Sequence, residues 1–197
     1  MVAQVDQPFG FQLYQAGLDP EALIECYSSN SDLIGLGDAV VLAGSYEGLG
    51  APNPLRPTVA RAAATGGIFG IVVGISQHRV EGSDHNLSRR HKPASVGMYM
   101  QVYPVKPSDI FKIQADAAVA VTQVGEVGNL ATIVDADTTT GISKMELSAS
   151  TLTTAQTAYQ MMVIGFPEDA FATYNTANQE VLVRINNIQA FHAFGGV

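Results

Sequence analysis

The chain has 197 residues, enough for one large domain or two small ones, and 47% of them are hydrophobic, as expected for a protein that buries a core. Only 14% are charged, against about 25% in a typical soluble protein, and the net charge is −8. The negative net charge excludes a sequence-independent nucleic-acid binder, which needs a positively charged surface. The low content of charged residues favours large buried contacts in an assembly.

The single cysteine, Cys26, excludes a disulfide within the chain and a cysteine-rich zinc site, and it suits assembly in a reducing cytoplasm. The first residues lack the basic region and apolar run of a signal peptide. No apolar run reaches the roughly 18 residues of a membrane-spanning helix. We therefore expect neither a membrane partner nor a nucleic-acid partner.

Residues 1–20 are expected to form an extended N-terminal arm. Phe9 and Phe11 flank a glycine after Pro8, a pattern that disfavours a helix. Their rings are expected to dock on this subunit or on a neighbour. We further expect that a chain without residues 1–11 folds but no longer binds its partner. The next segment has two readings, a helical turn that starts at Asp19 or a strand over 23–27.

Short runs of alternating or β-branched residues between turn signals follow. They predict strands at 23–27, 39–42, 58–62, 68–75, 94–105, 110–114, 130–134, 145–147, 159–166 and 180–185. The run 68–75 should be buried on both faces, with Gly70 and Gly74 where another backbone approaches closely. Residues 116–124 remain ambiguous between helix and strand, and 151–157 between a helical turn and an extended linker.

No segment shows the pattern of an amphipathic helix of three turns. The sequence therefore predicts an all-β protein with minor helix, a β-barrel or a jelly-roll-like sandwich with an extended N-terminal arm. We expect the arm at 1–20, a β-rich part at 21–107 and a barrel-like part at 108–197, with a weak boundary near 104–108. The last two parts either are separate or form one continuous domain.

The polar segment 78–93 concentrates basic residues in an acidic chain. Arg79, Arg89, Arg90 and Lys92 are four of the ten lysines and arginines. One interpretation is an ordinary charged surface loop. The other is a loop that docks on an acidic neighbouring surface, where arginine pairs with carboxylates.

Motifs of known chemistry are missing from the sequence. His78, His85 and His91, with Glu81 and Asp84, could in principle hold a metal, but their spacing matches no metal motif. Residues 135–146 resemble a calcium loop, yet glycine stands at its seventh position rather than its sixth, so we interpret the segment as a turn. No nucleophile elbow, phosphate loop or zincin motif occurs. We expect no catalytic residue, metal or cofactor, and a protein that is not an enzyme.

Several short motifs follow one another along the chain. They are Pro8-Phe-Gly-Phe11, Gly37-Asp-Ala-Val40, Gly67-Ile-Phe-Gly70, Ile110-Phe-Lys-Ile-Gln-Ala-Asp116 and Val181-Leu-Val-Arg-Ile-Asn-Asn187, with His192 and Gly195-Gly-Val197 at the end. Together they resemble the tailed-bacteriophage head decoration (capsid cement) proteins. Many members of that family carry a histidine where this chain has Ile188.

The resemblance implies a β-barrel or jelly-roll-like protein that sits outside an icosahedral shell and reinforces it. The major capsid protein and further copies of the chain, as a dimer or trimer, would then be its partners. It would be made in the bacterial host cytoplasm and reside on the capsid exterior. The aromatic N-terminal segment and the basic segment, which is not part of the family pattern, are where we expect the contacts, at Pro8, Phe9, Phe11, Arg79, Arg89, Arg90 and Lys92.

Two other functions remain open. A tail or fibre-associated virion protein could bind a receptor or glycan through Tyr46 or Tyr174. A metal-dependent hydrolase could use His78, Glu81 and His85.

Overall fold

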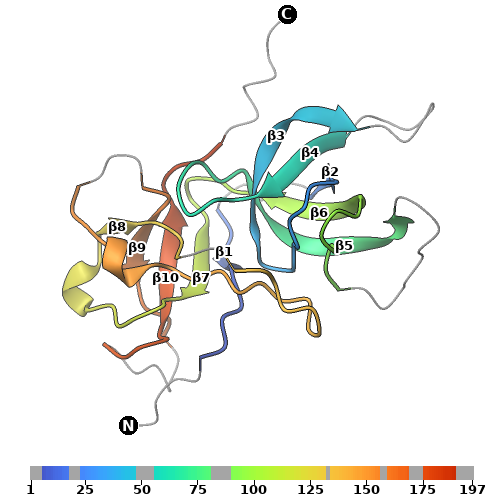
Figure 1. Cartoon of the computed structure of the whole chain (residues 1–197). Helices are drawn as coiled ribbons and strands as arrows, with labels where there is room; N and C mark the ends of the chain where they lie inside the picture. The colour runs from blue at the N-terminus through green and yellow to red at the C-terminus, as the bar shows by residue number, and fades with distance from the viewer. Residues whose placement is uncertain are drawn as a thin grey trace, which may run out of the picture.

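The computed structural model describes residues 6–17, 23–47, 56–80, 90–131, 134–155, 159–168 and 175–189, with side chains at all of these except 45–47 and 77–80. Its strands form two sheets, a barrel at the right of Figure 1 and a second sheet at the left. The barrel is closed and has the order β2-β4-β3-β5-β6. Its strands are β2 (Ile24–Ser28), β3 (Ala39–Glu47), β4 (Arg56–Arg61), β5 (Gly70–Val80) and β6 (Met98–Pro104).

The second sheet is open and has the order β1-β7-β10-β9-β8. Its strands are β1 (Gln12–Gln15), β7 (Ile110–Gln114), β8 (Val127–Gly128), β9 (Met161–Gly165) and β10 (Glu180–Ile185). All its neighbours are antiparallel, whereas β2 and β4 of the barrel are parallel. The helical segments in the described residues are the short 3-10 turns η1 (Val121–Gln123) and η2 (Ala149–Thr151). The predicted all-β class and the barrel are therefore confirmed.

Alternation along the strands explains how one core joins both sheets. In β10, Val181, Val183 and Ile185 are buried while the residues between them are partly exposed. Strand β6 contributes to two clusters, because Val102 packs inside the barrel and the neighbouring Tyr103 packs between barrel and second sheet. Such alternation follows from side chains that point to opposite faces of a strand.

The apolar run 68–75 is buried on both faces, as predicted, from Ile68 to Val72. A Cβ at Gly70 would lie 2.7 Å from the backbone oxygen of Tyr103, so the close backbone approach predicted there is confirmed. At Gly74 the nearest atom would be 3.4 Å away, which is ordinary contact. Val73 is 46% exposed, so two-sided burial ends before the predicted run does.

Two predicted strands are not formed in the described residues, and two strands, β1 and β8, were missed; β8 has only two residues, in a glycine-containing stretch that indicates a turn. Residues 145–147 do not form a strand, and neither do residues 130, 131 and 134, the described part of the predicted strand 130–134. Leu130 and Leu147 form only isolated bridges, because their partners are single residues rather than a continuous ladder. Strand β1 was missed, because the sequence 12–15 carries no apolar alternation and the strand is formed by its pairing with β7.

The expected boundary at 104–108 coincides with the change of sheet, since β6 ends at Pro104 and β7 begins at Ile110. The core nevertheless crosses it. Ile71 from the barrel and Val163 from the second sheet belong to the same cluster. Ile188, where the resembling family often has histidine, packs against that cluster and bridges Ile68.

Candidate binding surface

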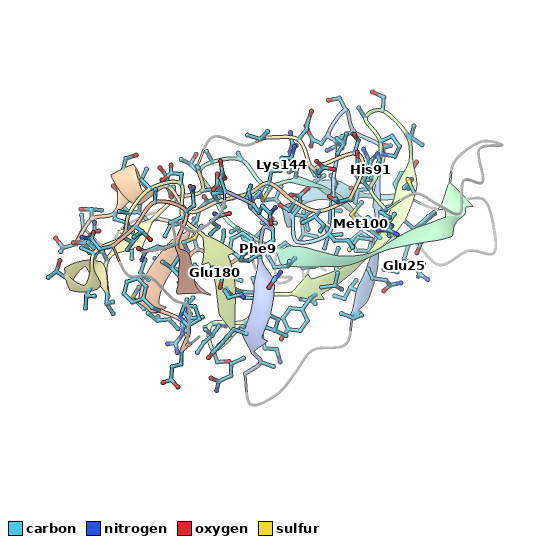
Figure 2. All side chains as sticks on the ribbon, turned by 90° about the horizontal axis from the view of Figure 1, so that it is seen from below. Phe9, Glu25, His91, Met100, Lys144 and Glu180 are labelled. Atoms are coloured by element: carbon cyan, nitrogen blue, oxygen red, sulfur yellow. The ribbon has the colours of Figure 1, made fainter. Side chains whose placement is uncertain are left out.

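A groove of about 510 Å³ runs between the N-terminal segment and the turn at 137–144. Phe9 and Lys144, one from each wall, are labelled near the centre of the molecule in Figure 2. We call it the arm groove. Its lining residues are Asp6, Gln7, Pro8 and Phe9 on one wall and Asp137, Thr140, Ile142 and Lys144 on the other.

Tight backbone packing fixes the wall formed by the N-terminal segment. The Phe11 N–H donates to Gly37 O at 2.9 Å. Gly10 and Gly37 have φ of +67° and +88°, which glycine adopts without strain. A Cβ at Gly37 would lie 2.6 Å from Phe9 O, and one at Gly10 would overlap Ser143. The N-terminal segment therefore lies so close to the barrel that any side chain larger than that of glycine at positions 10 and 37 would clash.

The opposite wall is a turn that is stabilised by its own hydrogen bonds. The backbone N–H groups of Thr139 and Thr140 both donate to Asp137 Oδ1 at 2.8 Å, and these bonds lower the pKa of the Asp137 carboxyl. Asp137 also lies 3.5 Å from Lys144 Nζ. Backbone bonds from Leu36 N to Gly141 O and from Ser143 N to Leu36 O, each 2.8 Å, tie the turn to the barrel.

The fully buried carboxyl of Asp38 links this turn to the barrel. Asp38 is 0% exposed; it accepts a hydrogen bond from the Ser143 hydroxyl and another from Gly35 N at 2.7 Å. Burial raises the pKa of Asp38 to about 6, although both hydrogen bonds oppose the shift. Asp38 and Ser143 have no exposed surface, so they position the groove wall and do not contact a partner.

One carboxylate beside the groove has an unsatisfied oxygen. Glu146 follows the wall residues Ile142 and Lys144 at a spacing of two in an extended segment. Its Oε1 is buried and has no hydrogen-bond partner among the described residues. Burial, followed by the negative charges of Asp6 and Asp116, raises the pKa of Glu146 to about 7.

Two of the residues expected from the sequence line the arm groove, and a third lies next to it. Pro8 and Phe9 form part of one wall, and the Phe9 ring lies 5.3 Å from Lys112 Nζ. The exposed Arg90 packs against the other wall, since a Cβ at Gly141 would lie 2.3 Å from Arg90 Cβ. The fold thus brings together residues about 80 positions apart in the chain.

The expectation that Lys92 contacts a neighbour was wrong. Lys92 is 0% exposed, and its ammonium donates to Asn30 O, Asp32 O and Pro93 O at 2.8, 2.7 and 3.2 Å. Residues 91–93 continue into the barrel, where Lys92 and Ile34 exchange backbone hydrogen bonds. The buried Lys92 side chain therefore links the segment 30–32 to the segment 92–93 through its hydrogen bonds. Residue 89 and the side chain of Arg79 lie outside the described part of the chain.

Phe11 also differs from the expectation of a contact with a neighbour. It is 3% exposed and its ring meets Phe111 edge to face at 5.9 Å between centroids, inside the shared core. Phe11 therefore docks on its own subunit, which was one of the two alternatives. Removing residues 1–11 would remove this core side chain, so the deletion is expected to destabilise the fold as well as to remove the N-terminal segment.

Strand β1 is a feature that the sequence reasoning missed. All four side chains are exposed, with Leu13 at 45% and Tyr14 at 50%. A signal was present, because residues 7–17 contain no charged side chain. A long uncharged stretch in an acidic chain could have been recognised as a contact surface.

Features of an active site are weak in the described residues. Cys26 is 0% exposed, and burial raises the pKa of its thiol to about 12, so its reactive thiolate is scarce at neutral pH. Across the described residues no three histidine, cysteine or acidic side chains gather as metal ligands. His78, Glu81, His85, Tyr46 and Tyr174 lie outside the described side chains.

Within the described ranges, no helix has the length and apolar character to cross a membrane. No family model matches the chain, and no curated protein and no solved structure matches it.

Proposed function

We propose that this protein is a structural, non-enzymatic component of a virus particle that binds the outer surface of an icosahedral phage capsid. It stabilises the shell by bridging neighbouring capsid subunits. The observation that carries the proposal is the arm groove, because Pro8 and Phe9 of the phage-like Pro8-Phe-Gly-Phe11 motif form one of its walls. Arg90, from the basic segment, lies beside the other wall.

The groove suits binding better than catalysis. Its described lining combines the apolar Pro8, Phe9 and Ile142 with carboxylates and one lysine, and both walls are held rigidly by backbone hydrogen bonds. A rigid, mixed surface of this kind binds a protein segment with little loss of conformational entropy. Repetition of a modest contact over a symmetric shell resists internal pressure, because the contacts of each patch must fail together.

The test is binding of the purified chain to capsids that lack it, measured by co-sedimentation. Ile142→Asp places a charge in the groove and should weaken binding by about tenfold or more. Val124→Asp is the matched control, because Val124 is 41% exposed and Ile142 39%. Failure of the unaltered chain to bind capsids, or equal effects of the two substitutions, would contradict the proposal.

A further inference from the structure

The open edge of the second sheet is an interaction surface distinct from the arm groove. The barrel is closed, so the second sheet supplies the two edge strands, β1 and β8. The outer side of β8 is covered, because Val127 and Thr153 exchange backbone hydrogen bonds of 2.9 and 3.0 Å. Within the described residues β1 pairs with β7 alone. It is therefore the edge left open for another strand.

Strand β1 also lacks most of the protection that edge strands usually carry. It contains no lysine, no other charge and no proline, and Leu13 and Tyr14 are about half exposed. Unprotected edges of this kind pair with further strands. The register shift between Leu13 and Gln15 leaves Tyr14 without a partner in β7, so the ladder with β7 is regular at Gln12 and Leu13.

Charge indicates which partner fits this edge. The chain carries −8 overall, so two copies repel each other unless they meet where charge is absent. Residues 7–17 are the uncharged stretch that contains β1. Such a strand offers no ion pair to a basic or acidic partner, but it can face its own copy without opposing like charges.

We propose that β1 pairs antiparallel with β1 of a second copy and joins two five-stranded sheets across a two-fold axis. Opposed residues in an antiparallel pair share a face, so a two-fold axis normal to the sheet must place one residue opposite itself. Pairing around Leu13 sets it against Leu13 of the second copy and Gln12 against Tyr14. The dimer adds backbone hydrogen bonds and brings the two exposed Leu13 side chains into contact on one face of the sheet.

Sedimentation equilibrium of the full chain tests the dimer. We expect a monomer–dimer equilibrium whose dissociation constant rises about tenfold or more in Leu13→Lys, because two lysines then face each other. Val124→Lys, at 41% against 45% exposure, should leave the equilibrium unchanged. An unaltered melting temperature of Leu13→Lys, measured at a concentration low enough for both chains to be monomers, shows that the fold is intact.

A covalent readout sharpens the test. Leu13→Cys should form a disulfide-linked dimer on mild oxidation, while Cys26 stays reduced because it is 0% exposed, and Val124→Cys should stay monomeric. A monomer up to about 0.1 mM, a trimer, or a dimer that Leu13→Lys leaves intact overturns the proposal. The proposal is also overturned if the unaltered chain is a monomer and Leu13→Lys loses capsid binding, because β1 then contacts the capsid and not a second copy. A dimer that fails to bind capsids contradicts only the proposed function.

Discussion

Lys92 is a charged side chain that is buried and still has a hydrogen-bond partner for each of its donors. Its three ammonium hydrogen bonds reach the carbonyls of Asn30, Asp32 and Pro93, which matches the three donors of the group. Burial lowers the pKa of Lys92 to about 8, and the nearby Asp32 limits this shift. A lysine in this place links the segment after β2 to the segment before β6.

Lys92→Met should lower the free energy of unfolding by about 1–3 kcal/mol, because it leaves buried carbonyl oxygens without donors. Lys144→Met is the control, since Lys144 is 41% exposed and its ion pair with Asp137 is a surface contact worth little. Urea denaturation at pH 7 measures both. Equal effects of the two substitutions would show that the three hydrogen bonds of Lys92 do not stabilise the fold.

Asp38 makes stability depend on pH in an unusual direction. Its pKa is raised from 3.8 to about 6, so the folded state binds more protons than the unfolded state between these values. The contribution of Asp38 to the free energy of unfolding therefore falls as pH rises through this window, by at most about 1.4 kcal/mol per pH unit. Asp38→Asn should remove this slope. Urea titrations at pH 4 and 7 test it, and an unchanged slope would refute the assignment.

Glu146 should show the same sign in a higher window, because burial and its acidic neighbours raise its pKa from 4.5 to about 7. Its contribution to stability is lost as pH rises from about 4.5 to about 7. Glu146→Gln should therefore be more stable than the unaltered chain at pH 8 and equal to it at pH 4. Thermal melts at the two pH values measure this, and lower stability of the variant at pH 8 would contradict it.

At the scale of elements, the contact between the N-terminal segment and the barrel depends on close backbone packing. Gly37 and Gly125 have similar positive φ, +88° and +92°, but only Gly37 faces a neighbouring backbone. Gly37→Ala should cost clearly more stability than Gly125→Ala, because both carry the backbone strain of about 1 kcal/mol and only Gly37→Ala also displaces Phe9. Chemical denaturation compares the two, and equal losses would show that the segment moves aside freely.

Across the molecule as a whole, barrel and second sheet share one hydrophobic cluster. Ile68 and Ile71 of the barrel side pack with Phe111, Ile113 and Val163 of the other side. Neither sheet can unfold without exposing this surface, so calorimetry of the full chain should show one transition with equal calorimetric and van't Hoff enthalpies. Two separate transitions would instead identify 21–107 and 108–197 as independent units.

Local sequence patterns were enough to predict the fold class and most strands. The segments 110–114 and 180–185 match β7 and β10, because alternation and turn residues specify a strand wherever one face is buried. The sequence also indicated Pro8, Phe9 and the basic segment as places for contact, and two of these positions line the arm groove.

Contacts between distant segments set the remaining features. They buried Lys92 and Phe11, because burial depends on which parts of the chain meet, such as Ile34 with Lys92 and Phe11 with Phe111. They also made β1 a strand and, within the described residues, left that strand at the open edge of its sheet. The residues in contact lie far apart in the chain, as Ile34 does from Lys92 and Gln12 from Lys112, and no local pattern of side chains encodes such contacts.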